Sequence, residues 1–206
     1  CVATGLAALW LLARPARGTG SASGVPLPEV PFTDVTRSSG LRFRHVNGAT
    51  GQKLLPETMG GGVAFFDFDN DGAPDLLFSN GRAWRDAPPT TGGSESSLAL
   101  YRNDGAGRFI EVTTESGLEC ALYGMGLACA DYDNDGWVDV FVTGVGDQRL
   151  FKNLGGGRFA DVTMAAGLQA ASGSWGTSAA WLDYDNDGRL DLFVCQYVDW
   201  SEELDL

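Results

Sequence analysis

Twelve aspartates recur in three nonapeptides whose spacing is suited to holding a cation. Each nonapeptide has carboxylates at positions 1, 3, 5 and 9 and a glycine at position 6: Asp67–Asp75, Asp131–Asp139 and Asp183–Asp191. In a tight loop alternate side chains point inward, and the glycine permits the sharp turn. Carboxylates held so close together would repel one another strongly unless a hard cation lay among them.

The chemistry of these loops favours Ca²⁺. Oxygen ligands in a flexible loop suit Ca²⁺ better than a softer metal, and better than Mg²⁺, which needs a stricter octahedron. We therefore expect about three Ca²⁺ ions, one for each loop, bound by the four carboxylates and by the backbone carbonyl at position 7. An ordinary acidic turn is the alternative, and three matching copies argue against it. The predicted ligands are Asp67, Asp69, Asp71, Ala73, Asp75, Asp131, Asp133, Asp135, Trp137, Asp139, Asp183, Asp185, Asp187, Arg189 and Asp191.

An EF-hand is the obvious rival for such a loop, and the flanking residues argue against it. The EF-hand loop needs a bidentate glutamate at position 12 and a helix on each side. Position 12 is Phe78, Val142 or Val194. The residues on both sides of each loop are short apolar runs, which predict strands. Each loop therefore joins two strands.

A second repeated block follows the strand pair. Leu100–Thr113 matches Leu150–Thr163, and both blocks predict a hairpin around a glycine-rich turn. One unit thus has four short strands, and successive loops begin 64 and 52 residues apart. Four strands in a repeat of this length predict an all-β fold of the β-propeller type, with blades at about 59–113 and 123–163 and an incomplete one at 175–206. A β-solenoid fits less well, because its repeats are only about nine residues long.

Two further features fit a ring of blades. Phe32–Thr36 repeats the last strand of the hairpin and predicts an orphan outer strand within a lead-in segment, residues 25–58. Phe32, Phe109 and Phe159 share one position in the repeat, which predicts core side chains. Small residues before each loop suit an inner strand, where blades crowd around the axis: Ala64, Ala128, Ala179 and Ala180.

The loop pattern resembles a known family. A glycine seven residues before the first aspartate, followed by Asp-x-Asp-x-Asp-Gly-x-x-Asp, is similar to the FG-GAP or VCBS repeat of integrin-α-type propellers. Three segments narrow the likeness to bacterial relatives of cartilage acidic protein, which usually carry an ASPIC/UnbV domain after the propeller. They are Phe43–Gly48, Leu55–Asp67 and Tyr197–Trp200.

This resemblance covers roughly residues 30 to 200 and implies a calcium-loaded, secreted propeller of about seven blades. The sequence departs from the integrin motif in having Asn80-Gly81 and Thr143-Gly144 in place of its Gly-Ala-Pro half. The 206 residues also include no recognisable ASPIC/UnbV domain. About three of the seven blades fit into 206 residues, so we expect a fragment of a longer product.

Charge and composition exclude some partners. The net charge is −13, and the three loops hold 12 of the 27 acidic residues. Three bound Ca²⁺ ions would leave about −7, so the acidity is concentrated in the metal loops. No basic stripe exists to meet phosphates, so we expect no nucleic-acid partner.

The N-terminal segment predicts export. Cys1–Ala13 is apolar, and Arg14 and Arg17 follow it. Such a run is short for a membrane span but suits the apolar part of a signal peptide. Residues 1–24 are therefore a partial signal peptide or a membrane anchor, and the chain is expected to be secreted or at the cell surface, periplasmic or extracellular.

Other reactive side chains are few. His45 is the only histidine, which excludes a histidine-based metal triad, and we expect it to have a structural hydrogen-bonding role. Cys120, Cys129 and Cys195 allow several pairings, and buried free thiols are the expected state.

Three classes of function remain open. The leading one is a non-catalytic extracellular binding module for a protein or carbohydrate, with structural calcium. The second is an enzyme on a propeller scaffold that acts on polysaccharide, with catalytic residues outside these 206 residues. A calcium sensor fits least, because loops fixed between strands have no helix pair to open.

Overall fold

The computed structural model describes residues 32–84 and 96–205. Its contacts divide the chain into two compact units, Cys1–Asp34 and Val35–Leu206, and every helix and strand described belongs to the second unit. The predicted signal or anchor segment, residues 1–24, lies outside the described residues. In the part of the chain that is described, no helix is long and apolar enough to cross a membrane.

Antiparallel strands make three sheets that follow one another along the chain, as expected for an all-β protein. Sheet one has the order β1 (Val63–Phe66), β2 (Asp75–Ser79), β3 (Leu98–Asn103), β4 (Phe109–Glu111). Sheet two has the order β5 (Tyr123–Ala130), β6 (Asp139–Val145), β7 (Gln148–Asn153), β8 (Phe159–Asp161). Sheet three pairs β9 (Gly176–Leu182) with β10 (Asp191–Gln196). The helices are one turn long: η1 (Leu55–Thr58), α2 (Thr113–Ser116) and α3 (Glu202–Asp205).

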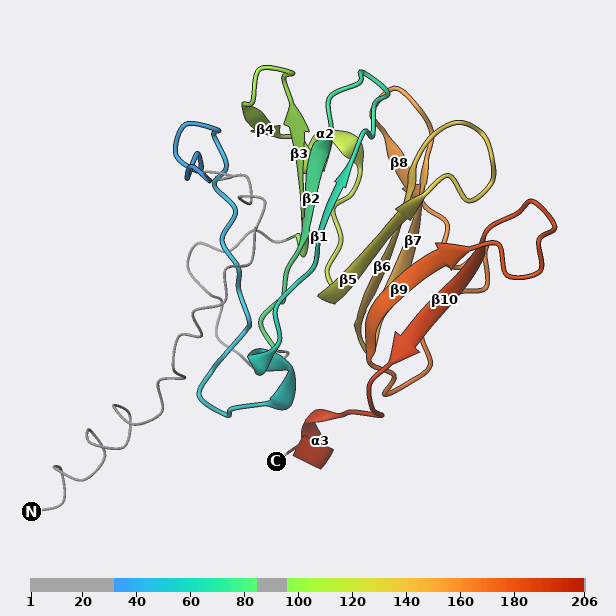
Figure 1. Ribbon diagram of the computed structural model, residues 1–206. Helices are drawn as coiled ribbons and strands as arrows, with labels where there is room; N and C mark the ends of the chain where they lie inside the picture. The colour runs from blue at the N-terminus through green and yellow to red at the C-terminus, as the bar shows by residue number, and fades with distance from the viewer. Residues whose placement is uncertain (1–31, 85–95, 206) are drawn as a thin grey trace, which may run out of the picture. The chain divides into compact units, whose positions relative to one another are not determined.

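Each acidic loop joins the first two strands of a sheet. The strand register closes every loop in the same way, because the residue before position 1 pairs with the aspartate at position 9. The pairs are Phe66 with Asp75, Ala130 with Asp139, and Leu182 with Asp191. Since β1, β5 and β9 run into their loops in the same sense, the loops emerge from corresponding ends of the sheets (Figure 1). The strands on both sides exclude an EF-hand.

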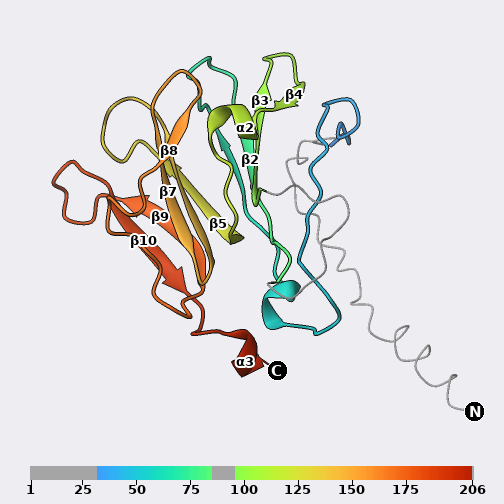
Figure 2. The ribbon, with the colours of Figure 1, turned by 180° about the vertical axis from the view of Figure 1, so that it is seen from behind.

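Within the second unit the sheets lie side by side, with β1 next to β5 and β5 next to β9 (Figures 1 and 2). The backbone N–H of Gly62 donates to the carbonyl of Met125 at 2.7 Å, which joins sheets one and two directly. A Cβ on Gly126 would lie only 2.6 Å from the carbonyl oxygen of Thr177, so sheets two and three approach equally closely. The backbones of neighbouring first strands therefore approach each other most closely at glycines. Ala64 and Ala128, which we expected at the crowded inner strand, pack in the apolar layers between the sheets.

Apolar side chains fill the space between successive sheets. Between sheets one and two the buried side chains include Phe66, Leu77, Leu100, Val140 and Phe151. Between sheets two and three, Phe141 and Leu150 pack against Trp181, Leu192 and Val194. β-Branched and aromatic residues favour such pleated surfaces, and the alternation of side chains places one set on each face.

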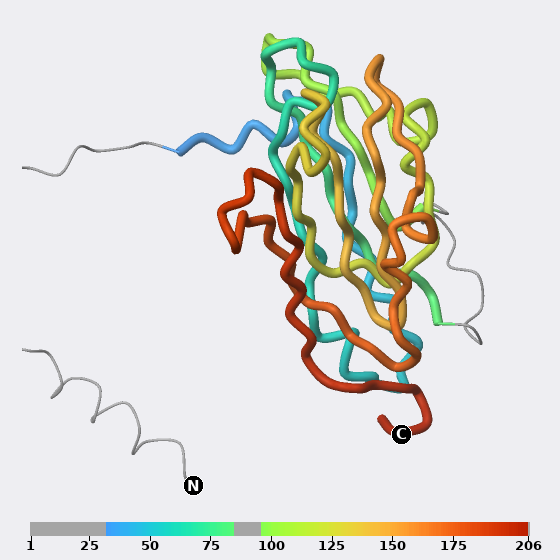
Figure 3. The backbone as a smooth tube through the Cα atoms, turned by 90° about the vertical axis from the view of Figure 1, so that its right-hand side faces the viewer, coloured from blue at the N-terminus to red at the C-terminus, as the bar shows by residue number. Residues whose placement is uncertain are grey.

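Residues 41–46 run lengthwise beside sheet one without forming an assigned strand (Figures 1 and 3). The ring of Phe43 stacks on Phe78 with centroids 4.4 Å apart. The side chain of Asn80 accepts from the N–H of Val46 at 2.7 Å and donates to the carbonyl of Arg44 at 3.1 Å. These contacts cover much of the face of sheet one that points away from sheet two.

Phe32–Thr36, which the sequence predicts to be an outer strand, is not assigned as a strand in the described residues. These residues pair with no strand among those described, and the Phe32 side chain is 95% exposed rather than in the core. Phe159 is buried as expected, and Phe109 is half-buried.

The turn that follows an outer strand is nevertheless present after this segment. The N–H of Ser39 donates to the carbonyl of Val35 at 2.8 Å. The same bond recurs after β4 and after β8, from Ser116 to Val112 and from Ala166 to Val162, each at 2.9 Å.

Cys120, Cys129 and Cys195 are free thiols. Burial raises the pKa of Cys120 and of Cys129 to about 12, so both are protonated at neutral pH. Cys195 was expected to be buried but is exposed, because its side chain is on the face of sheet three that points away from sheet two.

Candidate metal centres

The carboxylate at position 1 organises the turn of every loop. Asp67 accepts hydrogen bonds from the backbone N–H groups of Asp71 at 3.1 Å and Gly72 at 2.8 Å. Asp131 and Asp183 make the same pair of bonds in loops two and three. The loops therefore share one backbone conformation.

Left-handed backbone at positions 4 and 6 makes this turn. Position 4 is asparagine, with φ between 57° and 60° at Asn70, Asn134 and Asn186. Position 6 is glycine, with φ between 83° and 88°. Asparagine and glycine tolerate this region far better than other residues, which explains the Asn-Asp-Gly sequence.

Three carboxylates converge in each loop. In each group the carboxylate oxygens lie within 4.8 Å of one another, close enough to hold one metal ion. The groups are Asp67, Asp69 and Asp71; Asp131, Asp133 and Asp139; and Asp183, Asp185 and Asp191. The aspartate at position 5 also accepts from the N–H of the residue at position 7, at 2.8 Å to 3.0 Å in the three loops. The carbonyls of Ala73, Trp137 and Arg189 stay predicted ligands.

The aspartate at position 9 has a structural task besides its place near the metal. Asp75 accepts from the N–H of Phe68 at 3.0 Å and from the N–H of Asn103 at 2.7 Å. Asp139 makes the equivalent bonds to Tyr132 and Asn153. Both carboxylates are fully buried, and that burial raises the pKa of each to about 6.

Loop three differs from the others in exposure. Asp191 accepts from the N–H of Tyr184 at 2.9 Å, as its counterparts do. Its side chain is exposed, whereas Asp75 and Asp139 are covered by a third strand of their own sheet. Sheet three has two strands among the described residues, so this cover is missing there.

A buried oxygen in loop one fits a bound cation. The Oδ1 atom of Asp69 is buried, and no residue of the described chain donates a hydrogen bond to it. Burial, followed by the neighbouring charge of Asp71, raises the pKa of Asp69. Leaving a charged oxygen unpaired is costly, and a cation among the three carboxylates would remove that cost. The all-oxygen donor set is the kind that hard cations prefer.

In loop two a lysine contacts two of the carboxylates, those at positions 3 and 5. Lys152 of β7 donates from Nζ to Oδ2 of Asp133, and Nζ lies 3.0 Å from Oδ2 of Asp135. The hydrogen bond from Lys152 holds the pKa of Asp135 below its usual value. The contact of Lys152 with the loop was not predicted from the sequence, although Arg102 and Lys152 occupy the same position in the two matching hairpins.

Neighbouring loops also touch. The side-chain amide of Asn70 donates to the carbonyl of Gly136 at 3.0 Å, which links loop one to loop two. Phe68, at position 2, is buried against Phe159 with ring centroids 6.2 Å apart. Tyr184, at the same position of loop three, is exposed.

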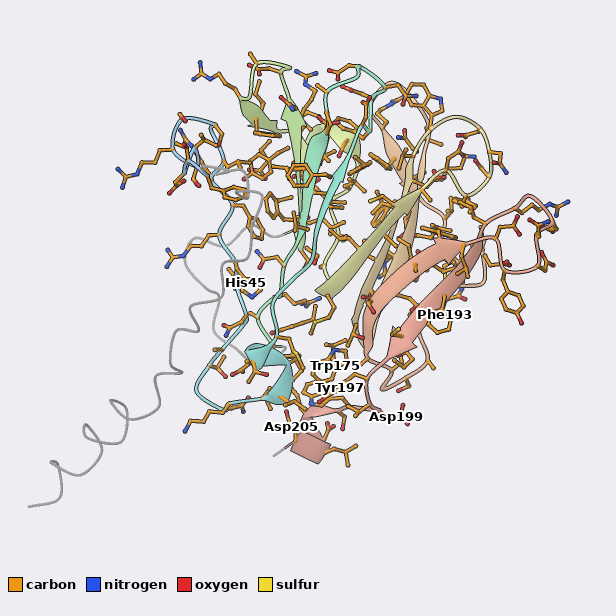
Figure 4. All side chains as sticks on the ribbon, in the orientation of Figure 1. His45, Trp175, Phe193, Tyr197, Asp199 and Asp205 are labelled. Carbon is orange, nitrogen blue, oxygen red and sulfur yellow. The ribbon has the colours of Figure 1, made fainter. Side chains whose placement is uncertain are left out.

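The opposite ends of the sheets carry an aromatic cluster. Tyr123 begins β5 and Trp175 directly precedes β9; both are buried, and Trp84 stacks on Tyr123 with ring centroids 4.5 Å apart. Trp175 and Tyr197 pack edge to face in this region (Figure 4). A groove of about 510 Å³ opens beside the cluster, and its lining includes Arg82, Trp84, Tyr123, Asp147, Trp200 and Glu203.

His45 lies on the segment beside sheet one (Figure 4). Its side chain is exposed to solvent. A structural hydrogen-bonding role, which we expected from the sequence, has no support in this position.

Repeated antiparallel sheets, each opened by an acidic loop with the same hydrogen bonds, define an all-β repeat protein with candidate metal centres. The chain belongs to the family of FG-GAP-like repeats, whose profile matches residues 90–142 and 131–194. This match confirms the repeat family predicted from the loops; the narrower likeness to ASPIC/UnbV-associated proteins stays a prediction. No curated protein matches the chain.

Proposed function

We propose that this protein is a calcium-stabilised extracellular binding module with a β-propeller fold. The observation that carries the proposal is that three carboxylates converge in each of three loops, which share the same backbone bonds and lie at corresponding ends of three sheets. The FG-GAP-like match supports it, because such repeats are typical of extracellular proteins and often bind calcium.

Each loop would hold one Ca²⁺ through its aspartates at positions 1, 3, 5 and 9 and the carbonyl at position 7. The ion would neutralise carboxylates that otherwise repel one another across less than 4.8 Å. Because position 9 begins the second strand, each site would also fix the junction between two strands. Calcium is structural in this proposal.

The sheets would be blades of a propeller of about seven blades. Successive sheets meet through their first strands, and an apolar layer lies between each neighbouring pair. Apolar side chains also remain exposed on the outward faces, Phe65 on sheet one at 69% and Phe193 on sheet three at 61% (Figure 4). Further blades would bury these faces, since propellers leave only short, protected edges.

A protein or carbohydrate partner would bind at the groove beside the aromatic cluster. Trp84, Trp200 and Tyr123 provide apolar contact, and Arg82, Asp147 and Glu203 provide polar groups around it. Binding sites typically combine these two kinds of lining. We propose that the module does not catalyse a reaction, because the loop aspartates are committed to the metal and efficient acid–base catalysis needs a free group near the substrate.

Calcium content tests the proposal directly. Elemental analysis of the purified full-length chain should give one Ca²⁺ for each intact loop, and chelator should lower its melting temperature. Asp183→Ala should remove one ion. Asp199→Ala, which deletes the same charge at an exposed position outside the loops, should remove none. A chain without calcium, or with a melting curve that chelator leaves unchanged, would contradict the proposal.

The partner and the location need separate measurements. Full-length chain should bind a glycan or an extracellular protein on arrays in calcium, and Arg82→Ala or Glu203→Ala should weaken that binding with melting temperature unchanged. Analysis of the bound ligand should find it intact. Calcium-dependent cleavage would favour the enzyme alternative, and cytosolic protein with an uncleaved N-terminus in fractionated cells would contradict export.

A further inference from the structure

Loop two contains its own cation. The Nζ atom of Lys152 donates to Asp133 and lies 3.0 Å from Asp135, so one ammonium spans positions 3 and 5 of the loop. The side chain of Lys152 is 27% exposed, which places this pair partly out of the solvent that would screen it. A lysine ammonium is a compact charge with three donors, which suits it to bridge two carboxylates.

In the described residues of loop one, no lysine bridges the carboxylates at positions 3 and 5. Its position 3 residue, Asp69, has a buried oxygen to which no described residue donates. The residue equivalent to Lys152 is Arg102 on β3, which is exposed and acts on Asp69 through its charge, as the weakest of the causes that set the pKa of that carboxyl. The two loops thus have the same carboxylates but differ in how closely a basic side chain approaches them.

From this contrast we infer that Lys152 is an internal counter-ion that takes the place of the metal in loop two and competes with Ca²⁺ for Asp133 and Asp135. The inference rests on the proposed calcium binding. When Ca²⁺ enters, the ammonium must give up both carboxylates and then stays close to a like charge. Loop two therefore binds Ca²⁺ more weakly than its four aspartates alone would, and the metal-free loop keeps its shape better than loop one does.

The competition makes two opposite predictions for one substitution. Lys152→Met keeps the length of the side chain and removes its charge, so it should tighten Ca²⁺ binding at loop two by about tenfold, the change expected for removing a like charge a few ångströms away. In calcium-free buffer the same variant should melt at a lower temperature, because four carboxylates lose their only close cation among the described residues. Lys152→Arg keeps the charge and should keep the weak binding.

A matched control separates this local effect from the change in net charge. Lys53→Met removes the same charge and adds the same side chain, and Lys53 is exposed just before η1, at the ends of the strands opposite the loops (Figure 1). It should change neither the Ca²⁺ affinity of loop two nor the melting temperature in calcium-free buffer.

The measurement is calorimetric titration of the full-length chain with Ca²⁺ in a background of Asp67→Ala and Asp183→Ala, which disables loops one and three. Thermal melting of the otherwise unsubstituted chain gives a second readout if that background folds poorly. A tenfold gain for Lys152→Met with no gain for Lys53→Met supports the inference. Equal or weaker Ca²⁺ binding by Lys152→Met would overturn it alone, whereas a chain that binds no Ca²⁺ at any loop would overturn the proposed function as well.

Discussion

The side-chain amide of Asn153 donates a hydrogen bond of 2.8 Å to the carbonyl of Phe68, 85 residues earlier in the chain. The donor is on β7 of sheet two, and the acceptor is the second residue of the acidic loop of sheet one. The backbone N–H of Asn153 also donates to Asp139 in its own loop at 2.7 Å. One asparagine therefore connects neighbouring acidic loops.

Asn153→Ala should lower the free energy of unfolding by about 1–2 kcal/mol more than Asn103→Ala, because it leaves a buried carbonyl without a donor. Asn103 is a matched control: it donates to Pro74 as Asn153 does to Val138, and each accepts from a glycine N–H two residues on. Among these side-chain hydrogen bonds, Asn153 differs from Asn103 by its additional bond to the carbonyl of Phe68. Urea unfolding of both variants measures the difference, and equal losses would show that the bond between sheets contributes nothing.

The sequence predicted the features that arise within one repeat. Loop conformation, flanking strands and hairpins depend on residues close in the chain, such as the asparagine and glycine that adopt left-handed backbone. The match to FG-GAP-like repeats supports the same interpretation of the repeat. Contacts between repeats were missed, and so was the pairing of Lys152 with Asp133, because they depend on how strands are placed in space. The outer strand predicted at Phe32–Thr36 is not assigned among the described residues; the pattern there carries strand propensity, but a strand forms only beside a partner.

The close approach of sheets two and three predicts a steric effect at Gly126. Gly126→Ala should destabilise the chain by about 1–3 kcal/mol, since its Cβ would lie 2.6 Å from the Thr177 carbonyl oxygen and neither backbone can move freely. Gly60→Ala is the control, because a Cβ there meets nothing within 4 Å. Thermal melting compares them, and a Gly126→Ala chain as stable as Gly60→Ala would show that the strands can separate at low cost.

Positions 5 and 9 of loop one should respond differently to alanine. In calcium-free buffer Asp75→Ala should cost about 1–3 kcal/mol, because two buried N–H groups, those of Phe68 and Asn103, lose their acceptor. Asp71→Ala should change stability by less than about 0.5 kcal/mol there, since its side chain is exposed. In calcium both variants should bind one ion fewer. Similar losses in calcium-free buffer would show that Asp75 acts only through the metal.

The buried aspartates predict opposite effects of pH on the metal-free and the calcium-loaded chain. Burial raises the pKa of Asp75 and of Asp139 to about 6 in the folded chain, above the unfolded value of about 3.9. The folded state therefore binds these protons more tightly, and their contribution to stability is complete below the unfolded pKa and is lost as pH rises through about 6. Lowering the pH from about 7.5 to about 5 should raise the melting temperature of the metal-free chain.

Calcium bound as proposed should reverse this dependence, because it would bind the ionised carboxylates and protons would compete with it. The gain in melting temperature on adding calcium should therefore shrink as the pH falls over the same range. Melting in resin-treated buffers with and without calcium measures both trends. The double variant Asp75→Asn and Asp139→Asn cannot titrate at these sites, so its metal-free melting temperature should depend less on pH. If the unsubstituted and double-variant chains respond alike, other groups control the pH dependence.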